Sequence, residues 1–314
     1  MPKILITGGA GFIGRHCVKK FLENKWDVVV LDKNPPLNFT EFFPQSNLQV
    51  HVGDVCLESD IGKSIANCDA VLHLAAQISV QYSMNFPDET KHVNVIGTNS
   101  VLSQCLDNNI SKSVFASSAA VYGDNENLPL HEESNLHCLS PYAVSKLENE
   151  KQVSDYRKRG LNAVCLRFFN VYGGYYNGES DSVIPRLIRT ISNKQAPEIF
   201  GDGVQTRDFI HVHDVANAIF KLFNTVETFP HDVINICSST QTSISELLTI
   251  INEKMIETGR IETPIEPIFK PHREGDILHS LGSNHRIKSL IGDFLKTNIN
   301  DGIEDSVQKY DIKN

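Results

Sequence analysis

The feature that most restricts the fold is a glycine-rich turn near the amino terminus. Residues 3–7 form a short apolar run, Gly8, Gly11 and Gly14 follow at intervals of three, and apolar residues then recur with helical spacing. In such a strand, turn and helix the glycines let the backbone approach a pyrophosphate, which binds the amides at the helix amino terminus. The pattern therefore predicts a dinucleotide-binding α/β unit.

A second apolar run, at residues 28–31, ends in Asp32. A carboxylate at this place can accept hydrogen bonds from the adenosine ribose hydroxyls, and it repels a 2′-phosphate. We therefore expect NAD as the cofactor. Because the adjacent Lys33 carries a positive charge, NADP stays an alternative cofactor.

The alternation of apolar runs and longer segments continues along the chain. Further strands are expected at 48–52, 70–74, 113–117 and 162–167, with segments between them that can hold crossover helices. Near-continuous apolar strands are typical of a parallel sheet covered on both faces. The sequence thus predicts a doubly wound (Rossmann) α/β domain at 1–173. A smaller substrate-binding lobe is expected within 174–314, with about 204–238 returning to the Rossmann domain.

Tyr142 and Lys146 lie four residues apart in a segment, 140–146, that is expected to begin a helix. Their side chains should therefore share one helical face. An ammonium group beside a phenol lowers the pKa of the phenol, so Tyr142 could act as a general base. Taken alone, this spacing more often marks a surface pair.

Composition limits the partners. The net charge of −9 argues against nucleic acid and anionic membranes as partners. No apolar run is long enough to cross a bilayer, and a strand at the very start leaves no room for a signal peptide, so a cytoplasmic protein is expected. The sequence His211-Val212-His213 would place two imidazoles on one face of a strand, a spacing compatible with metal. Because no third ligand stands out and no Cys-x-x-Cys pair occurs among the seven cysteines, no metal is expected.

Taken in order, the motifs resemble those of the extended short-chain dehydrogenases/reductases, and most of all the UDP-glucose/UDP-N-acetylglucosamine 4-epimerase group. They extend over nearly the whole chain. The motifs that carry the resemblance are Gly8-x-x-Gly11-x-x-Gly14, Asp32, Asp54-Val55, His73-Leu74-Ala75-Ala76, Asn94, Ser117-Ser118-Ala119-Ala120-Val121-Tyr122-Gly123 and Tyr142-x-x-x-Lys146.

The resemblance implies a set of site residues. The catalytic residues would be Ser118, with Ser117 as the alternative serine, Tyr142 and Lys146. The residues implied to bind NAD are Gly8, Gly11, Phe12, Ile13, Gly14, Asp32, Lys33, Asn34, Asp54, Val55, Leu74, Ala75, Ala76, Gln77, Asn94, Tyr142, Lys146 and Phe168. Those implied to bind the nucleotide-sugar are Ser118, Asn170, Val183, Phe200, Arg207, Arg273, Asp276 and Ser280.

The resemblance also implies a reaction, in which a sugar loses a hydride from C4 to NAD and regains it on the other face. Dehydratases of the family carry an acidic residue after the catalytic serine or threonine, whereas here Ala119 and Ala120 supply none. A reductase or dehydratase, and a non-enzymatic NAD-sensing regulator, remain as alternatives. Ser280 is small, so an N-acetylated sugar is expected to fit beside UDP-glucose. A homodimer through helices near 89–106 and 142–157 is the expected assembly.

Overall fold

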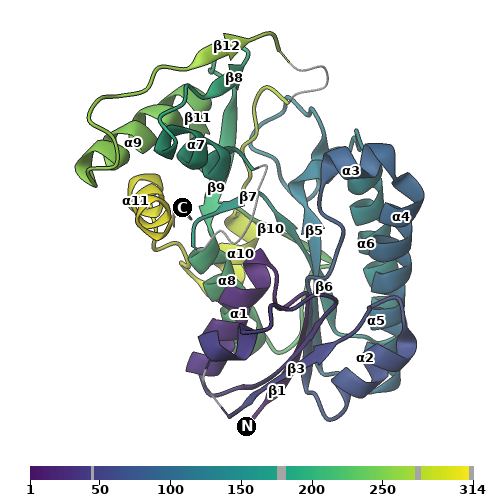
Figure 1. Cartoon of the computed structure of the whole chain (residues 1–314). Helices are drawn as coiled ribbons and strands as arrows, with labels where there is room; N and C mark the ends of the chain where they lie inside the picture. The colour runs from purple at the N-terminus through teal and green to yellow at the C-terminus, as the bar shows by residue number, and fades with distance from the viewer. Residues whose placement is uncertain (44–45, 175–181, 273–276, 311–314) are drawn as a thin grey trace.

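The structure is a computed structural model that describes residues 1–43, 46–174, 182–272 and 277–310 (Figure 1). Its main sheet is built from β1 (Lys3–Thr7), β2 (Asp27–Asp32), β3 (Leu48–Val52), β4 (Ala70–His73), β5 (Lys112–Ser118), β6 (Ala163–Phe168) and β10 (Val233–Ile236). The spatial order is β10-β6-β5-β4-β1-β2-β3, and all neighbours are parallel. The prediction of a doubly wound α/β fold is confirmed.

Side chains that alternate along each strand enter two separate apolar cores, one on each face of the sheet. On β1, Ile4 and Ile6 pack in the first core and Leu5 in the second. The first core is covered by α1 (Phe12–Glu23), α8 (Val212–Thr225) and α10 (His285–Ile291). The second is covered by α2 (Glu58–Ile65), α5 (Gly97–Asp107) and α6 (Pro141–Lys158). Burial on both faces explains why the strands are apolar at nearly every position.

A smaller lobe lies above the main sheet in Figure 1. Its strands are β7 (Asn170–Tyr172), β9 (Thr206–His211) and β11 (Gln241–Ser243), which form one sheet, and β8 (Glu198–Phe200) and β12 (Ile268–Lys270), which form another. Its helices α7 (Val183–Ser192), α9 (Ile244–Glu257) and α11 (Ile299–Lys309) enclose a third apolar core. Between β9 and β11 the chain returns to the main body, because α8 packs on α1 and β10 pairs with β6.

In the part of the chain that the structure describes, five short helical elements connect the larger ones. They are η1 (Phe39–Phe42), α3 (Val80–Asn85), α4 (Pro87–Lys91), the π-helix η2 (His92–Ile96) and η3 (Ala119–Tyr122). No helix among the residues that the structure describes is long and apolar enough to span a membrane.

The order of the strands creates a crevice. From β1 the chain proceeds outward to β2 and β3, and it then returns to β4 on the other side of β1. At such a switch point the connections at the carboxyl ends of the two strands diverge, and ligands bind in the space between them. The turn at Gly8 and the segment after His73 therefore face the same crevice.

One local prediction is wrong. His211 and His213 do not lie on one strand face, because β9 ends at His211 and α8 begins at Val212. The ring of His211 caps this helix, with Nδ1 accepting a hydrogen bond from the backbone N–H of His213 at 3.3 Å. The acidic Asp214 in the first turn favours the helix further. Across the described ranges, no group of three His, Cys, Asp or Glu side chains is placed to hold a metal ion.

Candidate active site

A cavity of about 860 Å³ opens at the carboxyl ends of the main-sheet strands and is lined by both the Rossmann domain and the smaller lobe. The predicted site residues that line it are Gly8, Gly11, Phe12, Ile13, Gly14, Asp32, Lys33, Asn34, Asp54, Val55, Leu74, Ala75, Ala76, Ser117, Ser118, Tyr142, Lys146, Phe168, Asn170, Val183, Arg207 and Ser280. Three predicted residues, Gln77, Asn94 and Phe200, are not in the lining. Arg273 and Asp276 lie outside the described residues.

The glycine turn is packed so tightly that side chains cannot be added. A Cβ on Gly14 would lie 2.2 Å from the carbonyl oxygen of Gly8, and a Cβ on Gly8, which has φ +66°, would lie 2.7 Å from the backbone nitrogen of Ala75. The turn therefore contacts the segment after β4 directly, and it leaves the amino-terminal end of α1 facing the cavity. These features fit the pyrophosphate of a dinucleotide.

The end of β2 supplies the polar contacts expected for an adenosine ribose. Asp32 accepts hydrogen bonds from the N–H groups of Ala10 at 3.0 Å and Asn34 at 3.1 Å, which fixes its carboxylate beside the turn. The ammonium of Lys33 lies 3.0 Å from an oxygen of Asp54 and is mostly exposed. Lys33 is thus engaged by Asp54, and the carboxylate of Asp32, which lines the cavity, is where a ribose hydroxyl is expected to bind.

The segment after β4 is held by Asn94, which is fully buried in the π-helix η2. The Asn94 amide accepts from the backbone N–H of Gln77 at 2.8 Å and donates to the carbonyl of Gln77 at 3.0 Å and to Oγ of Ser145 at 2.9 Å. Short π-helical turns often occur at functional sites. Here the π-helical turn connects the segment after β4 to Ser145 on α6. Asn94 therefore holds this segment in place without lining the cavity itself.

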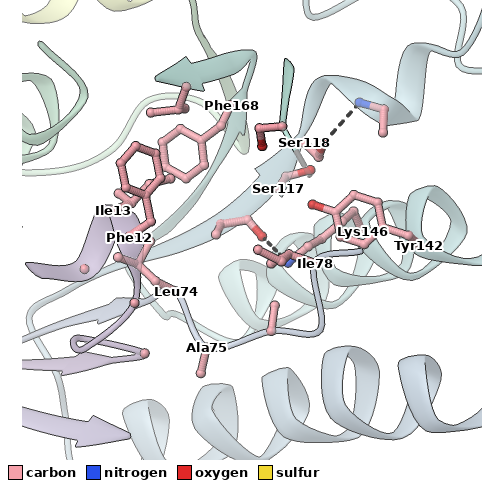
Figure 2. A pocket seen from close by; sticks show the side chains of 18 of the residues that line it. Phe12, Ile13, Leu74, Ala75, Ile78, Ser117, Ser118, Tyr142, Lys146 and Phe168 are labelled. Atoms are coloured by element: carbon pink, nitrogen blue, oxygen red, sulfur yellow. Dashed lines mark hydrogen bonds between the residues drawn. The ribbon is translucent and has the colours of Figure 1, made fainter. Parts of the chain in front are cut away.

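Ser118 and Ser117 point in different directions, as adjacent residues on a strand do. The Oγ of Ser117 is buried and donates to Glu150 at 2.5 Å. The Oγ of Ser118 accepts from the N–H of Ala120 at 3.2 Å, and its side chain lies close enough to Tyr142 to lower the pKa of that phenol. Figure 2 shows Ser118 and Tyr142 close to each other on one side of the cavity, with Phe12 and Phe168 on the opposite side. Of the two serines, Ser118 is the one placed beside the phenol.

In the chain without bound ligands, the pKa of Tyr142 does not show the lowering expected from Lys146. Burial raises the pKa of Tyr142, and the side chain of Ser118 only partly opposes this rise. The ammonium of Lys146 donates to the carbonyl of Ala116 at 3.1 Å and lies 5.8 Å from the centre of the Tyr142 ring. Burial lowers the pKa of Lys146 to about 8. Lys146 is not among the groups that shift the pKa of Tyr142 here, so the expected lowering of that pKa by its ammonium stays a prediction.

A buried imidazole joins the glycine turn to the helices behind it. Nδ1 of His73 lies 2.7 Å from Oγ1 of Thr7, and Nε2 lies 3.0 Å from Oγ1 of Thr98 on α5. Burial, together with the nearby charge of Lys146, lowers the pKa of His73 to about 3. The imidazole is therefore neutral at pH 7 and leaves Lys146 as the cation at this position.

The smaller lobe contributes the opposite side of the cavity. Asn170 on β7 donates to the carbonyl of Asp208 at 3.1 Å, and Arg207 on β9 donates to the carbonyl of Thr206 at 2.9 Å. Ser280 is 9% exposed, and its N–H donates to the carbonyl of Thr206 at 3.1 Å. Among the residues that the structure describes, the guanidinium of Arg207 and the polar side chains of Asn170, Ser182 and Ser280 line this side, which suits a phosphorylated ligand.

Sequence reasoning missed several residues of the site. Ile78 and Val80 are exposed apolar residues that line the cavity; their position directly after the Ala75-Ala76 segment is the signal that could have found them. Ser83 is fully buried, and its Oγ accepts from the backbone N–H of Tyr142 at 3.1 Å. That contact joins α3 to the first turn of α6, and nothing in the local sequence indicates it.

Comparisons with known proteins agree with this geometry. Residues 4–237 match the model of the NAD dependent epimerase/dehydratase family. A putative UDP-glucose 4-epimerase of Methanocaldococcus jannaschii is 37% identical, with 87% of each chain covered. The UDP-N-acetylglucosamine 4-epimerase of Methanobrevibacter ruminantium, solved with UDP-N-acetylmuramic acid, is 31% identical and superimposes with a TM-score of 0.90 over 98% of this chain and 97% of that one. The UDP-glucose 4-epimerase of Thermotoga maritima, solved with UDP-glucose, is 29% identical with a TM-score of 0.88 over 98% of both chains.

Gly14→Ala should weaken NAD binding, because the new Cβ cannot fit against the Gly8 carbonyl and the turn must open. A hydrogen bond to a charged group contributes about 1.5–3 kcal/mol, so losing one raises the dissociation constant about tenfold or more. Titration calorimetry with NAD measures this. The control is Gly62→Ala on α2, where a Cβ meets nothing nearer than Oε1 of Gln104 at 3.6 Å. Wild-type affinity in Gly14→Ala would contradict the assignment of the turn.

Proposed function

The chain belongs to the NAD dependent epimerase/dehydratase family, and we propose that it interconverts UDP-glucose and UDP-galactose by epimerisation at C4. It is an NAD-dependent isomerase that acts on a nucleotide-sugar. One observation carries the proposal: Ser118 and Tyr142 meet in a cavity with a dinucleotide turn on one side and the lobe residues Asn170 and Arg207 on the other. A nucleotide-sugar and a dinucleotide can therefore both reach the phenol.

The residues of the chain divide the proton chemistry among them. Tyr142 takes the proton from the sugar O4, and Ser118 aligns O4 by hydrogen-bonding beside the phenol. Lys146 supplies a buried cation near the phenol and faces the region where the nicotinamide ribose would lie. NAD, when bound, supplies the redox chemistry by taking a hydride from C4 and returning it. As the hydride returns to C4, the oxygen at C4 takes its proton back from Tyr142, so the hydroxyl is restored and no net oxidation occurs.

The absence of an acid beside the serine favours epimerisation over elimination. Ala119 and Ala120 form the start of η3 and line the cavity directly after Ser118. Elimination of water needs a group that protonates the leaving hydroxyl, and two methyl side chains cannot do this. The 4-keto sugar is therefore returned to a 4-hydroxy sugar.

The direct test is incubation of the protein and NAD with UDP-glucose, followed by proton NMR. We expect UDP-galactose to accumulate until the two epimers reach equilibrium, with no lasting rise in absorbance at 340 nm. A stoichiometric rise at 340 nm would instead indicate a net dehydrogenase, and a product that has lost water would indicate a dehydratase. Either result would overturn the proposal, as would binding of NAD without turnover.

Tyr142→Phe should remove most turnover while leaving NAD bound, because only the hydroxyl that acts as base is lost. Loss of a positioned general base lowers rates by about 10²–10⁴. The matched control is Tyr82→Phe on α3, a half-buried phenol whose hydroxyl donates to the carboxylate of Glu89. Steady-state kcat and calorimetry with NAD provide the two readouts. A kcat for Tyr142→Phe near that of the control would refute the assigned role.

Ser280→Tyr should separate two classes of sugar. Ser280 lines the cavity and is held by its bond to Thr206, so a large side chain there would occupy space that an N-acetyl group needs. We propose that the wild type also accepts UDP-N-acetylglucosamine. The variant should lose kcat/KM for that sugar by about tenfold or more and keep it for UDP-glucose. An equal effect on both sugars would show that Ser280 is not the gate.

We also propose a homodimer through the helical layer that contains α6. Exposed apolar side chains occur along this layer, including Met84 and Phe86 near α3, Ile96 in η2 and Val144 on α6. Exposed apolar groups on neighbouring helices favour association. Light scattering after size exclusion should give twice the chain mass of 35.0 kDa. Val144→Glu should reduce the particle to one chain, and a monomeric wild type would contradict the dimer.

A further inference from the structure

A buried ion pair lies behind the two residues that meet in the cavity. Glu150 on α6 and Arg167 on β6 are 5% and 2% exposed. The guanidinium of Arg167 donates from Nε to Oε1 of Glu150 at 2.8 Å and from Nη2 to Oε2 at 2.7 Å. Glu150 comes eight residues after Tyr142 and four after Lys146, so it shares their helical face. The pair therefore fastens the active face of α6 to β6.

The same two side chains also hold the end of β5. Ser117, directly before Ser118, donates to Oε1 of Glu150 at 2.5 Å. Nη1 of Arg167 donates at 2.8 Å to the hydroxyl of Tyr122, which ends the η3 turn after Ser118. Ser117 precedes Ser118 and Tyr122 follows it, and their side chains are thus hydrogen-bonded to one carboxylate and one guanidinium. Movement of either would change the approach of Ser118 to the phenol.

Stability alone does not account for such a pair. Moving a carboxylate and a guanidinium out of water costs several kcal/mol per ion, and a well-packed apolar pair often gives equal or higher stability. An apolar pair, however, has no directional contacts. The fork of Arg167 fixes both distance and angle to Glu150, and it does so where α6, β5 and β6 must keep their relative positions.

We propose that Glu150 and Arg167 are positioning residues that hold Ser118 and Tyr142 in the geometry needed for proton transfer. This inference rests on the proposed epimerase function. Neither side chain is among the described residues that line the cavity, so both act through others: Glu150 through α6 and Ser117, and Arg167 through Glu150 and the η3 turn. Their loss should slow the chemical step more than it weakens substrate binding.

The test uses Glu150→Gln and Arg167→Lys in the full-length enzyme with NAD bound. We expect kcat for UDP-glucose to fall about 10- to 100-fold, because a misplacement of about 1 Å in an active site can cost 10²-fold. KM should change by about twofold at most, and the deuterium isotope effect at C4 should rise as hydride transfer becomes rate-limiting. A loss of packing alone would not lower kcat while leaving KM nearly unchanged.

The matched control is Asp232→Asn. Asp232 pairs with Arg157, at the other end of α6, at 2.6 Å, so this variant also breaks an ion pair on the catalytic helix. It should keep kcat within about twofold of the wild type even where thermal unfolding shows a lower midpoint. An equal fall of kcat in Asp232→Asn would overturn the inference, because any loosening of α6 would then have the same effect.

A single variant can fail to fold, since removing one partner leaves the other charge buried and unpaired. Glu150→Gln/Arg167→Met removes both charges, and it should fold and show the same loss of kcat with nearly unchanged KM. Wild-type kcat in this variant, or in either folded single variant, would overturn the positioning role while the proposed function stands. A wild type that does not epimerise would overturn the proposed function and this inference with it.

Discussion

The structure depends on the contact between the first turn of α6 and the end of β5, where Ser118 meets Tyr142. The helix is fixed at its start by Ser140, whose Oγ accepts from the N–H of Ala143 at 3.1 Å, and by Pro141 at its first position. Ser83 holds the backbone of Tyr142 from α3. Without this docking, the phenol would still lie on a helix but would have no partner in the cavity.

Burial decides the electrostatics of the site. It raises the pKa of Tyr142 and lowers those of Lys146 and His73, so each group is shifted toward its uncharged form. A phenol in this state keeps its proton until a further charge or a substrate hydroxyl changes its surroundings. In the chain by itself Tyr142 is therefore a neutral phenol, and it must lose its proton before it can act as a base.

Much of the fold could be predicted from sequence, because the apolar runs are long and end at recognisable residues such as Asp32 and His73. The glycine turn was equally clear, since no other residue fits at Gly14. Which of the two adjacent serines lies beside the phenol could not be read, because a shift of one residue reverses every side chain of a strand. The Glu150–Arg167 pair depends on how α6 docks on β6. The end of β9 at His211 depends on a cap formed by a side chain, and the pKa of Tyr142 depends on burial, which local sequence does not specify.

In the proposed reaction a hydride leaves C4 and returns to it within one cavity. The most direct measurement is turnover of UDP-glucose carrying deuterium at C4, in ordinary water, with the product analysed by NMR and mass spectrometry. We expect UDP-galactose that keeps its deuterium at C4, with none lost to water or to a pool of unbound NAD. Loss of the C4 label, or incorporation of solvent deuterium at C5 when the reaction runs in heavy water, would contradict it.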